Sequence, residues 1–347
     1  MVGKEVAQVQ LFASQPLENT IPADHPLRKI RTLCDEVLRP WMGAWESRYS
    51  DVGQRGIPPA VLLRALLLQA LYSIKSERAL CEQVQFNYLF RWFIGLDWED
   101  TVFDHSVLSK NRERLFGGGA AEAFLGEVVR AADSRKLLSN DRLVVDGTLI
   151  KAWASMKSFK ADDGSEDDKP NFKGTKRSNK THSSRTDSDA RLFRKGPGQE
   201  SMLCHMGHIL VDSVSGIIRA CRVTHATGTA EVEAALEMAD EHMKQGQTLV
   251  ADRFYDQGKF VQGARELGLR AHPRAKKKYS RLDGRTTKRS SYEASMKTRH
   301  IVERSFGWMK APGRMRQTVF RTTEKVGWQF TFMAGVMNLV RIANLAG

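Results

Sequence analysis

Cysteine is scarce in this sequence of 347 residues: there are four, scattered along the chain and with no CxxC pair. This argues against a disulfide framework and favours a reducing, cytosolic environment. Long apolar runs are missing too, because Arg64 and Gln69 interrupt the most apolar stretch, VLLRALLLQALYSI, which is too short to span a bilayer. The first residues, MVGKEVAQVQLF, lack the apolar segment of a secretion signal. We therefore expect a cytoplasmic location and no association with membranes.

Negative charge is also in short supply. Lys and Arg number 54 against 40 Asp and Glu, which gives a formal net charge of +14. Such a balance favours an anionic polymer as partner, with nucleic acid ahead of an anionic membrane. Hydrophobic residues make up 41% of the chain, so most of it should fold, and its length allows more than one average domain.

The first part of the chain, residues 1–137, reads as an all-helical domain. Pro58 and Pro59 suit the first turn of a buried helix, and Ser76 suits the N-cap of the next one. An aromatic cluster at 86–93 is expected in the core, with a subunit interface as the alternative. The domain either contains a helix-turn-helix, with 77–87 or 106–116 as the reading helix, or is a dimerisation module.

The second part, residues 138–347, reads as a mixed α/β domain with a central sheet. DRLVVDGTLIKAW predicts a strand, and a long polar loop is expected over 155–200. Residues 201–226 predict a β-hairpin that turns near 213–216. A helix, the strand QTLVADRFYD, a second helix and the short strand RAHPRA follow, and then a basic loop and further helices.

Three acidic residues follow or interrupt apolar segments of this domain. Asp146 lies at the end or in the middle of one strand, Asp252 ends another, and Glu303 lies on a late helix. Functional groups gather at the carboxyl ends of strands in open α/β sheets, and converging carboxylates repel one another unless a cation lies between them. Oxygen ligands suit Mg²⁺. The alternative for each aspartate is a turn or N-cap residue, and Asp256 competes with Asp252.

The stretch KTRHIVERSFGWMK, residues 297–310, predicts one helix with an apolar face and a narrow charged stripe. At about 100° per residue, Arg299, Glu303 and Lys310 fall within roughly 40° of one another. The plainer interpretation of Glu303 is an i,i+4 ion pair with Arg299, worth a few tenths of a kcal/mol.

Cysteines and histidines crowd the predicted hairpin and raise the alternative of a zinc site. With a turn at 214–215, Cys204 would face His225 and His208 would face Cys221. These two pairs lie about four residues apart along the strands, roughly 13 Å, which is too far for one tetrahedral site.

The motifs VVDGT, VADRFYD and RHIVERSFGWMK resemble those of the DDE transposases of bacterial insertion sequences, most closely the insertion-sequence-five family. The last motif of that family is a tyrosine, an arginine three on, a glutamate four further on and a lysine seven beyond. Arg299, Glu303 and Lys310 match it, whereas Met296 stands where the tyrosine is usual, which leaves the DNA contact at that position open. The resemblance extends over nearly the whole chain and implies a ribonuclease-H-like fold.

The resemblance also implies roles for these residues. Asp146, Asp252 and Glu303 would be the catalytic metal ligands, with two Mg²⁺ ions for which Mn²⁺ can substitute. Arg299 and Lys310 would contact the DNA end. We also assign DNA contact to basic residues of the loop at 276–289 and to the arginines that follow Asp252 and Glu303. They are Lys276, Lys277, Lys278, Arg253 and Arg304. The basic half of the polar loop, Lys173 to Lys195, is a further candidate.

The first hypothesis is therefore a transposase that binds the terminal inverted repeats of its own element, frees 3′-hydroxyls and joins them to target DNA. Its partner is double-stranded DNA, and because two ends must meet, a homodimer or larger assembly on DNA is expected. We expect it at the nucleoid of a bacterial cytoplasm. The alternatives are a metal-dependent nuclease without strand transfer, and a DNA-binding protein with an inactive site.

Overall fold

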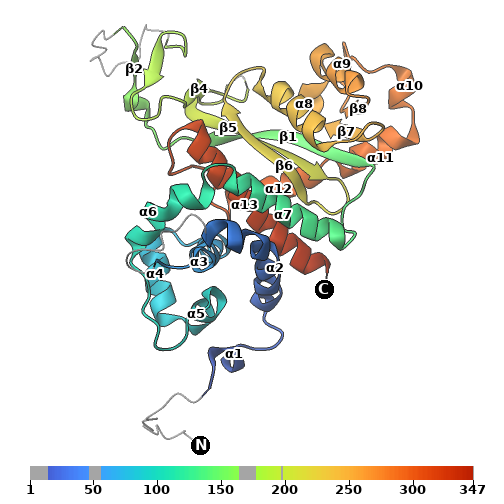
Figure 1. The fold of residues 1–347 in the computed structure, drawn as a ribbon. Helices are drawn as coiled ribbons and strands as arrows, with labels where there is room; N and C mark the ends of the chain where they lie inside the picture. The colour runs from blue at the N-terminus through green and yellow to red at the C-terminus, as the bar shows by residue number, and fades with distance from the viewer. Residues whose placement is uncertain (1–14, 47–55, 164–176, 197, 347) are drawn as a thin grey trace, which may run out of the picture.

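The computed structural model describes residues 15–46, 56–163, 177–196 and 198–346 (Figure 1). Its first half is helical, as the sequence predicts. Pro58 directly precedes α3, and the Ser76 side chain caps α4 by accepting a hydrogen bond from the backbone N–H of Ala79. The helices are α1 (Leu17–Thr20), α2 (Pro26–Glu46), α3 (Pro59–Leu71), α4 (Glu77–Phe86), α5 (Tyr88–Ile94), α6 (His105–Phe116) and α7 (Ala120–Ser134).

The aromatic cluster around α5 is only partly in the core. Phe90, Trp92 and Phe93 are buried, which confirms the expectation for these three. Phe86 and Tyr88 are 77% and 56% exposed, so for them the core prediction is wrong. The difference arises because Asn87 separates α4 from α5 and turns the chain between them.

The second half is built on a mixed sheet. Antiparallel β5 and parallel β7 lie on either side of β1, and β8 extends the sheet beyond β7 in parallel. Both β6 and β4 pair with the other edge of β5. This strand order is the ribonuclease-H-like arrangement that the resemblance implies. The strands are β1 (Arg142–Lys151), β4 (Arg191–Phe193), β5 (Met202–Asp212), β6 (Ile218–His225), β7 (Thr248–Ala251) and β8 (Arg270–Pro273).

Helices cover both faces of the sheet (Figure 1). On one face, α8 (Ala230–His242) and α9 (Gly258–Glu266) pack on Leu143 and Val145 of β1. On the other face, α12 (Ile301–Lys310) and α13 (Thr323–Leu345) pack on Val144. The alternation along β1 is what a strand buried on both sides requires. The later part of α13 also joins the core of the N-terminal helices, so this helix links the two halves.

The polar stretch 155–200 has more structure than the loop that its composition predicts. A short 3₁₀ turn, Met156–Ser158, leads into β2 (Phe159–Ala161), which pairs with β3 (His182–Ser184), and β4 joins the main sheet. Residues 164–176 and 197, with the candidate Lys173, lie outside the described part of the chain.

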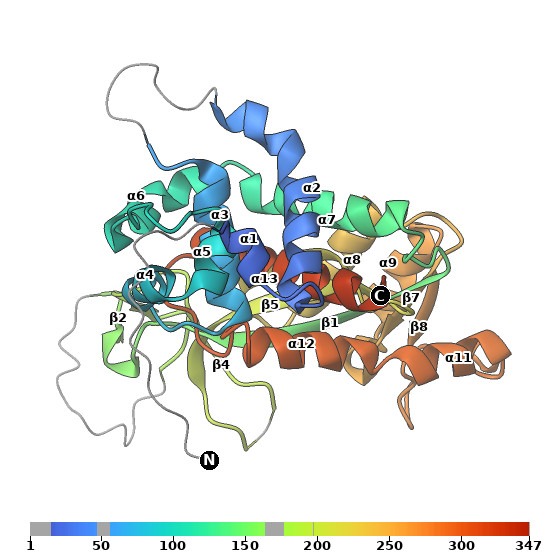
Figure 2. The ribbon, with the colours of Figure 1, turned by 90° about the horizontal axis from the view of Figure 1, so that it is seen from below.

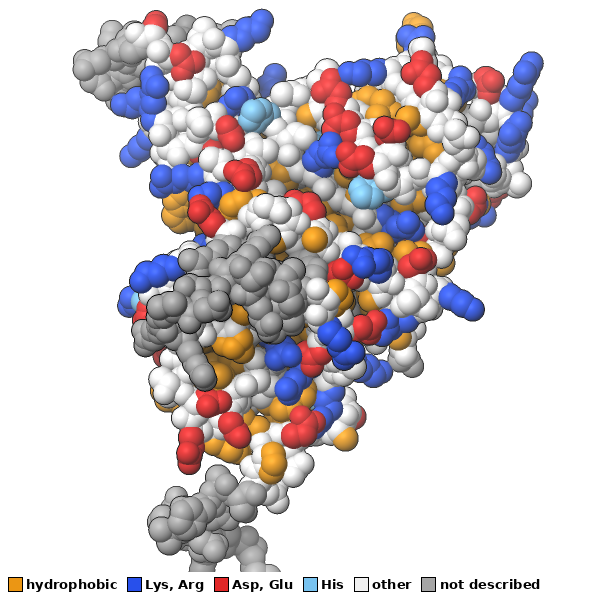
Figure 3. Space-filling view, in the orientation of Figure 1, with side chains coloured by type: hydrophobic (Ala, Val, Ile, Leu, Met, Phe, Trp, Pro, Cys, Tyr) orange, Lys and Arg blue, Asp and Glu red, His pale blue; other side chains and the backbone are white. Residues whose placement is uncertain are grey.

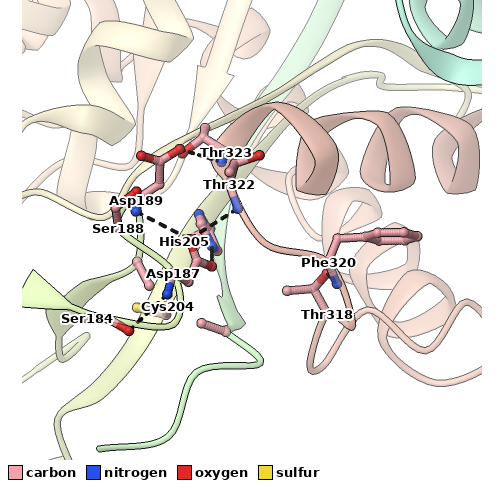
Figure 4. A network of polar contacts seen from close by, with 12 residues as sticks. Ser184, Asp187, Ser188, Asp189, Cys204, His205, Thr318, Phe320, Thr322 and Thr323 are labelled. Atoms are coloured by element: carbon pink, nitrogen blue, oxygen red, sulfur yellow. Dashed lines mark hydrogen bonds and ion pairs between the residues drawn. The ribbon is translucent and has the colours of Figure 1, made fainter. Parts of the chain in front are cut away.

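A buried polar network fixes this stretch to the start of α13 (Figure 4). Asp187 accepts a hydrogen bond from the backbone N–H of Thr322 at 3.1 Å and pairs with His205 Nε2 at 2.9 Å, and both side chains of the pair are fully buried. Asp189 accepts from the backbone N–H of Thr323 at 2.8 Å. Thr322 has a φ of 70°, a left-handed conformation that costs energy for a β-branched residue. The network therefore holds a strained N-cap in place.

The hairpin forms as predicted, but its register differs by one residue. His205 pairs with His225 and Ile209 with Cys221, because the register shifts between Leu210 and Val211. The predicted pairing of Cys204 with His225 is therefore wrong, as is that of His208 with Cys221. A β-bulge of one residue moves every later pair to a new partner.

No helix in the described part of the chain is long and apolar enough to cross a membrane.

Two short helices, α10 (Gly284–Thr287) and α11 (Ser290–Thr298), lead from the sheet to α12.

The contact between α13 and α7 depends on a missing side chain. A Cβ on Gly335 would lie 2.5 Å from Cε1 of Phe124. We expect Gly335→Ala to lower the free energy of unfolding by about 1–3 kcal/mol through this overlap. Gly327→Ala on the same helix meets nothing within 4 Å, and should raise it by about 0.5–1 kcal/mol. Urea denaturation of both variants measures these free energies. Equal effects would contradict the close packing of Gly335 against Phe124.

Candidate active site

Two neighbouring parallel strands carry the two aspartates. Asp146 lies in the middle of β1, and Asp252 directly follows Ala251 at the carboxyl end of β7. Because Val144 pairs with Val250, the two aspartates lie at nearly the same level of the sheet. Asp146 Oδ1 accepts a hydrogen bond from the backbone N–H of Gly147 at 2.8 Å, and Asp252 caps the following turn by accepting from Phe254 N–H at 2.7 Å. Asp252 therefore does act as a cap of the following turn, which is the alternative role that the sequence offers for it.

The environment of Asp146 disfavours its negative charge. Burial raises its pKa to about 6, with Asp252 adding to the rise and the cations Lys195 and Arg299 opposing it. The two aspartates are therefore near enough to repel each other. Their donors are carboxylate oxygens, and the like charges are only partly compensated, so the pair fits a hard divalent cation.

Glu303 is placed differently from the two aspartates. Its side chain is 63% exposed, and Oε1 lies 3.6 Å from Nη2 of Arg299. This is the i,i+4 ion pair that the sequence offers as the plainer interpretation. Within the described residues, no three side chains of the His, Cys, Asp and Glu types are grouped so as to hold a metal ion. The structure therefore brings Asp146 and Asp252 together and leaves Glu303 beside Arg299.

The predicted continuous helix over 297–310 is wrong in one respect. α11 ends at Thr298 and α12 begins at Ile301, with Arg299 and His300 in a turn between them. This break brings Arg299 to the start of α12, from where its charge acts on Asp146. Figure 2 shows α11 and α12 following each other along one side of the molecule.

Lysines complete the surroundings of Asp146. Lys195 Nζ donates a hydrogen bond to the backbone oxygen of Gly147 at 3.0 Å. Burial lowers the pKa of Lys310, and the positive charge of Lys195 lowers it further while Asp146 raises it. Lys195, Lys310 and Arg299 are thus three cations around one carboxylate, and they offer contacts for a phosphate.

Sequence reasoning missed Glu231 on α8. This residue is only 9% exposed, and a Cβ on Gly147 would lie 2.7 Å from its Oε1. Burial raises the pKa of Glu231 to about 7, Lys195 opposes the rise, and Asp146 and Asp252 add to it. In the sequence it looks like an ordinary acidic residue of a first helical turn, and only its burial sets it apart from Glu233.

The competition between Asp252 and Asp256 is resolved by their contacts. Asp256 is fully buried, and its two oxygens accept hydrogen bonds from the backbone N–H groups of Lys276 at 2.7 Å and Arg281 at 2.8 Å. Asp256 thereby fixes the base of the basic loop. Asp252 remains the aspartate beside Asp146.

The other candidate DNA contacts are mostly at the surface. Lys277 and Lys278 are exposed and Lys276 is half-buried, on a loop that leaves β8 at the same sheet edge as Asp252. Arg253 is exposed beside Asp252. Exposed Arg304 acts electrostatically on Arg341 of α13.

The cysteines and histidines weighed for zinc contact other groups. His205 pairs with Asp187, and His208 Nε2 lies 2.9 Å from Thr224 Oγ1. Cys221 Sγ lies 3.4 Å from Thr331 Oγ1.

The raised pKa of Asp146 predicts a pH-dependent loss in the free energy of unfolding. A carboxylate whose folded pKa is about 6 instead of 3.8 destabilises the fold above pH 6, and the cost vanishes below about pH 4. In EDTA, Asp146→Asn should therefore raise the free energy of unfolding at pH 8 by about 3 kcal/mol and leave it unchanged at pH 4. Urea denaturation at both pH values checks this. A variant less stable than wild type at pH 8 would contradict it.

Comparisons with known proteins identify the family of this chain. The family described as "Transposase DDE domain" matches residues 140–339, and "Transposase domain (DUF772)" matches residues 15–114. No curated protein matches this chain.

Solved transposase structures show only distant likeness. The piggyBac transposase synaptic complex with hairpin DNA is 10% identical, with 94% of this chain and 75% of that chain covered and a TM-score of 0.40. The Mos1 transposase paired-end complex with left transposon end is 10% identical, with 88% and 84% covered and a TM-score of 0.21. At these TM-scores neither likeness bears on the function of this chain.

Proposed function

This chain belongs to the DDE transposase family, and from that premise we propose how this DNA transposase of the insertion-sequence-five type acts. It binds the terminal inverted repeats of its own element, hydrolyses a phosphodiester at each end to free a 3′-hydroxyl, and joins that hydroxyl to target DNA. The observation that carries this proposal is the pair of aspartates on neighbouring strands, with three cations around Asp146.

The family depends on divalent metal. We assign the ligands as Asp146, Asp252 and Glu303, and the metal as two Mg²⁺ ions, with Mn²⁺ able to substitute. When bound, such ions would activate the attacking water or 3′-hydroxyl and stabilise the leaving oxygen. Glu303 is exposed, and its ion pair with Arg299 is worth only a few tenths of a kcal/mol, so little energy opposes its turning towards Asp146.

The basic side chains would position the DNA. Arg299, Lys310 and Lys195 surround Asp146, where they would neutralise charge on the phosphate and hold it in line for attack. These contacts orient the backbone and read no sequence. Base reading is assigned to the helical domain, with α4 or α6 as the reading helix.

The distribution of charge favours one face for DNA. The outer side of α8 carries a row of exposed acidic residues (Figure 3). They are Glu233, Glu237, Asp240 and Glu241. In Figure 3, Lys and Arg side chains gather instead at the edge where α10 lies. We therefore assign DNA to the side formed by α11, α12 and the basic loop, away from this acidic row.

The domain division stays a proposal, with residues 1–137 as the DNA-binding or dimerisation domain and 138–347 as the catalytic domain. The break between α7 and β1 supports it. Two DNA ends must be held together, so we propose a dimer or larger assembly on DNA, at the nucleoid of a bacterial cytoplasm.

End cleavage tests the proposed reaction. Labelled DNA that carries the gene's own flanking ends should be cut at the element boundary with Mg²⁺ or Mn²⁺ and remain intact in EDTA. The new ends should carry 3′-hydroxyls. Cuts scattered along the DNA without preference for the boundary would instead favour the nuclease alternative.

The basic loop should contribute affinity without sequence preference. Replacing Lys276, Lys277 and Lys278 together by Ala should weaken binding to end DNA and to random DNA alike. Each phosphate that is no longer neutralised reduces the magnitude of the negative slope of log K against log salt by about 0.9. The slope should therefore become shallower by about 2–3. The measurement is fluorescence anisotropy across a salt series. Replacing Lys244 and Lys259, on the α8–α9 side, should leave the slope unchanged.

A further inference from the structure

The loop between β8 and α10 presents an aromatic side chain to solvent. Tyr279 is 93% exposed, the largest exposed fraction of any large hydrophobic side chain in the described part of the chain. The partly exposed ring of Tyr72 packs on Phe90, with 4.7 Å between the ring centroids, and that of Tyr88 packs on Trp98 at 5.1 Å. At 93% exposure the ring of Tyr279 has almost no such contact within the described residues.

The backbone of Tyr279 is held in an unfavourable conformation. Its φ is 60°, in the left-handed region where a side chain with a Cβ is disfavoured and where glycine or asparagine is usual. Strained backbone of this kind persists only where the surrounding structure imposes it. The exposed ring and the strained backbone are both unfavourable in the free protein, which indicates that Tyr279 serves binding rather than folding.

Contacts at its base fix the loop tip, residues 276–281. The carboxylate of fully buried Asp256 accepts hydrogen bonds from the backbone N–H groups of Lys276 at 2.7 Å and Arg281 at 2.8 Å. These two bonds close the tip and hold Tyr279 between them. A side chain presented by a closed loop loses less conformational entropy when it binds than one on a freely moving segment.

The loop tip combines the ring with positive charge. Lys277, Lys278 and Arg281 are exposed on either side of Tyr279, at the edge of the molecule where Lys and Arg side chains gather (Figure 3). A basic surface that follows the nucleic-acid backbone, together with an aromatic ring on which a base stacks, is how proteins bind single strands. Inside a duplex both faces of a base are covered by its neighbours, so the ring requires a base that has left the stack.

Chain length places Tyr279 near the proposed site of cleavage. The backbone N–H of Arg274 donates a hydrogen bond to the backbone oxygen of Ala251 at 3.0 Å, directly before Asp252. The five residues from Arg274 to Tyr279 and one strand spacing together span at most about 23 Å. Bases lie about 3.4 Å apart along a strand, so this distance corresponds to about seven nucleotides.

We propose that Tyr279 stacks on an unpaired base of the DNA within about seven nucleotides of the cut, while Lys277, Lys278 and Arg281 bind the flanking phosphates. The loop tip thereby prefers DNA that has opened near the cleavage site over fully paired DNA. The proposal rests on the proposed function, because the position of the cut follows from the assignment of Asp146 and Asp252.

DNA binding in EDTA tests the stacking contact without cleavage. Fluorescence anisotropy compares fully paired end DNA with the same DNA carrying seven mismatched pairs on one or the other side of the element boundary. We expect wild type to bind one mismatched DNA more tightly than paired DNA. Tyr279→Asn should lose affinity for that DNA by about 5- to 150-fold, the scale for removing one stacked ring.

Two further variants separate the ring from the backbone and from the charge. Asparagine suits the left-handed conformation, so Tyr279→Asn removes the ring without adding strain. Tyr279→Phe keeps the ring and should bind as wild type does. Lys277→Ala should weaken binding to paired and mismatched DNA alike and keep the preference. Wild-type affinity of Tyr279→Asn for mismatched DNA, or Tyr279→Phe binding as weakly as Tyr279→Asn, would overturn the proposal.

Photocrosslinking locates the base. 5-Iododeoxyuridine is placed singly at each unpaired position, and the crosslinked peptides are mapped. Crosslinks to Tyr279 from one or two of these positions are expected, because a stacked ring lies against one base. Crosslinks confined to other residues would contradict the stacking contact.

Cleavage by wild type with Mg²⁺ separates this inference from the proposed function. If wild type cuts no DNA but its preference for mismatched DNA depends on the ring, the proposed reaction fails and the stacking contact stands. If wild type cuts at the boundary and Tyr279→Asn binds and cuts as wild type does, only the role of Tyr279 is overturned.

Discussion

Glu303→Gln is expected to slow cleavage of the DNA ends at least about 100-fold, the scale at which the loss of one electrostatic stabiliser slows an enzyme. Glutamine keeps the shape and the exposed position but removes the charge that a divalent cation needs. Binding of end DNA should change less than about threefold, because the cationic residues remain. The cleavage rate is measured under single-turnover conditions, so that slow product release does not hide the chemical step.

Glu293 offers a close control for this variant. It is exposed on α11 and forms an i,i+4 ion pair with Lys297 at 2.7 Å, much as Glu303 pairs with Arg299. If an ion pair were the whole role of Glu303, Glu293→Gln and Glu303→Gln would have equally small effects. Equal rates for the two variants would therefore remove Glu303 from the site. A loss confined to Glu303→Gln supports its assignment as a ligand.

Asp187→Ala is expected to lower the free energy of unfolding by about 3–5 kcal/mol, because it leaves His205 without its fully buried partner. It also removes the acceptor for the backbone N–H of strained Thr322, at the start of α13 (Figure 4). Since α13 links the sheet to the N-terminal helices, the loss should appear in one cooperative transition. Urea denaturation of the whole chain measures it.

Asp189→Ala provides the comparison. Asp189 caps the neighbouring N–H of Thr323, but its side chain is 32% exposed, so in the variant water can take over as the acceptor for that N–H. The expected cost is about 1 kcal/mol. Equal costs for the two variants would show that the Asp187–His205 pair contributes no more than a surface cap.

Patterning predicted the elements of this fold well where a segment has a single clear period. β1 and the hairpin lie where the residue pattern predicts them, and α8 follows the hairpin in the predicted order. The hairpin register was wrong because a bulge between Leu210 and Val211 depends on packing against both faces of β5, which no local pattern records. β4 was missed for a similar reason, since its pairing with β5 and the burial of nearby Asp187 are tertiary contacts.

In the candidate site, too, the sequence predicted what local patterns record and missed what depends on tertiary contacts. Asp146 and Asp252 were found because each interrupts or ends an apolar strand. This signal can be read from the neighbouring residues in the sequence alone. Asp256 has a similar signal, and only its hydrogen bonds to the basic loop reveal its structural role. Glu231 has no sequence signal apart from its place in a first helical turn. Its significance depends on how closely α8 packs on Gly147, which is a property of the folded chain.

Strand transfer tests the central claim most directly. Purified protein is incubated with Mg²⁺, DNA that carries the gene's own flanking ends, and a supercoiled target, and the products are sequenced across their junctions. The account predicts junctions that join the 3′ end of the element to target DNA. It also predicts that these junctions disappear in EDTA and in Asp146→Asn. End binding without cutting or joining under either Mg²⁺ or Mn²⁺ would contradict the catalytic role and leave a DNA-binding protein.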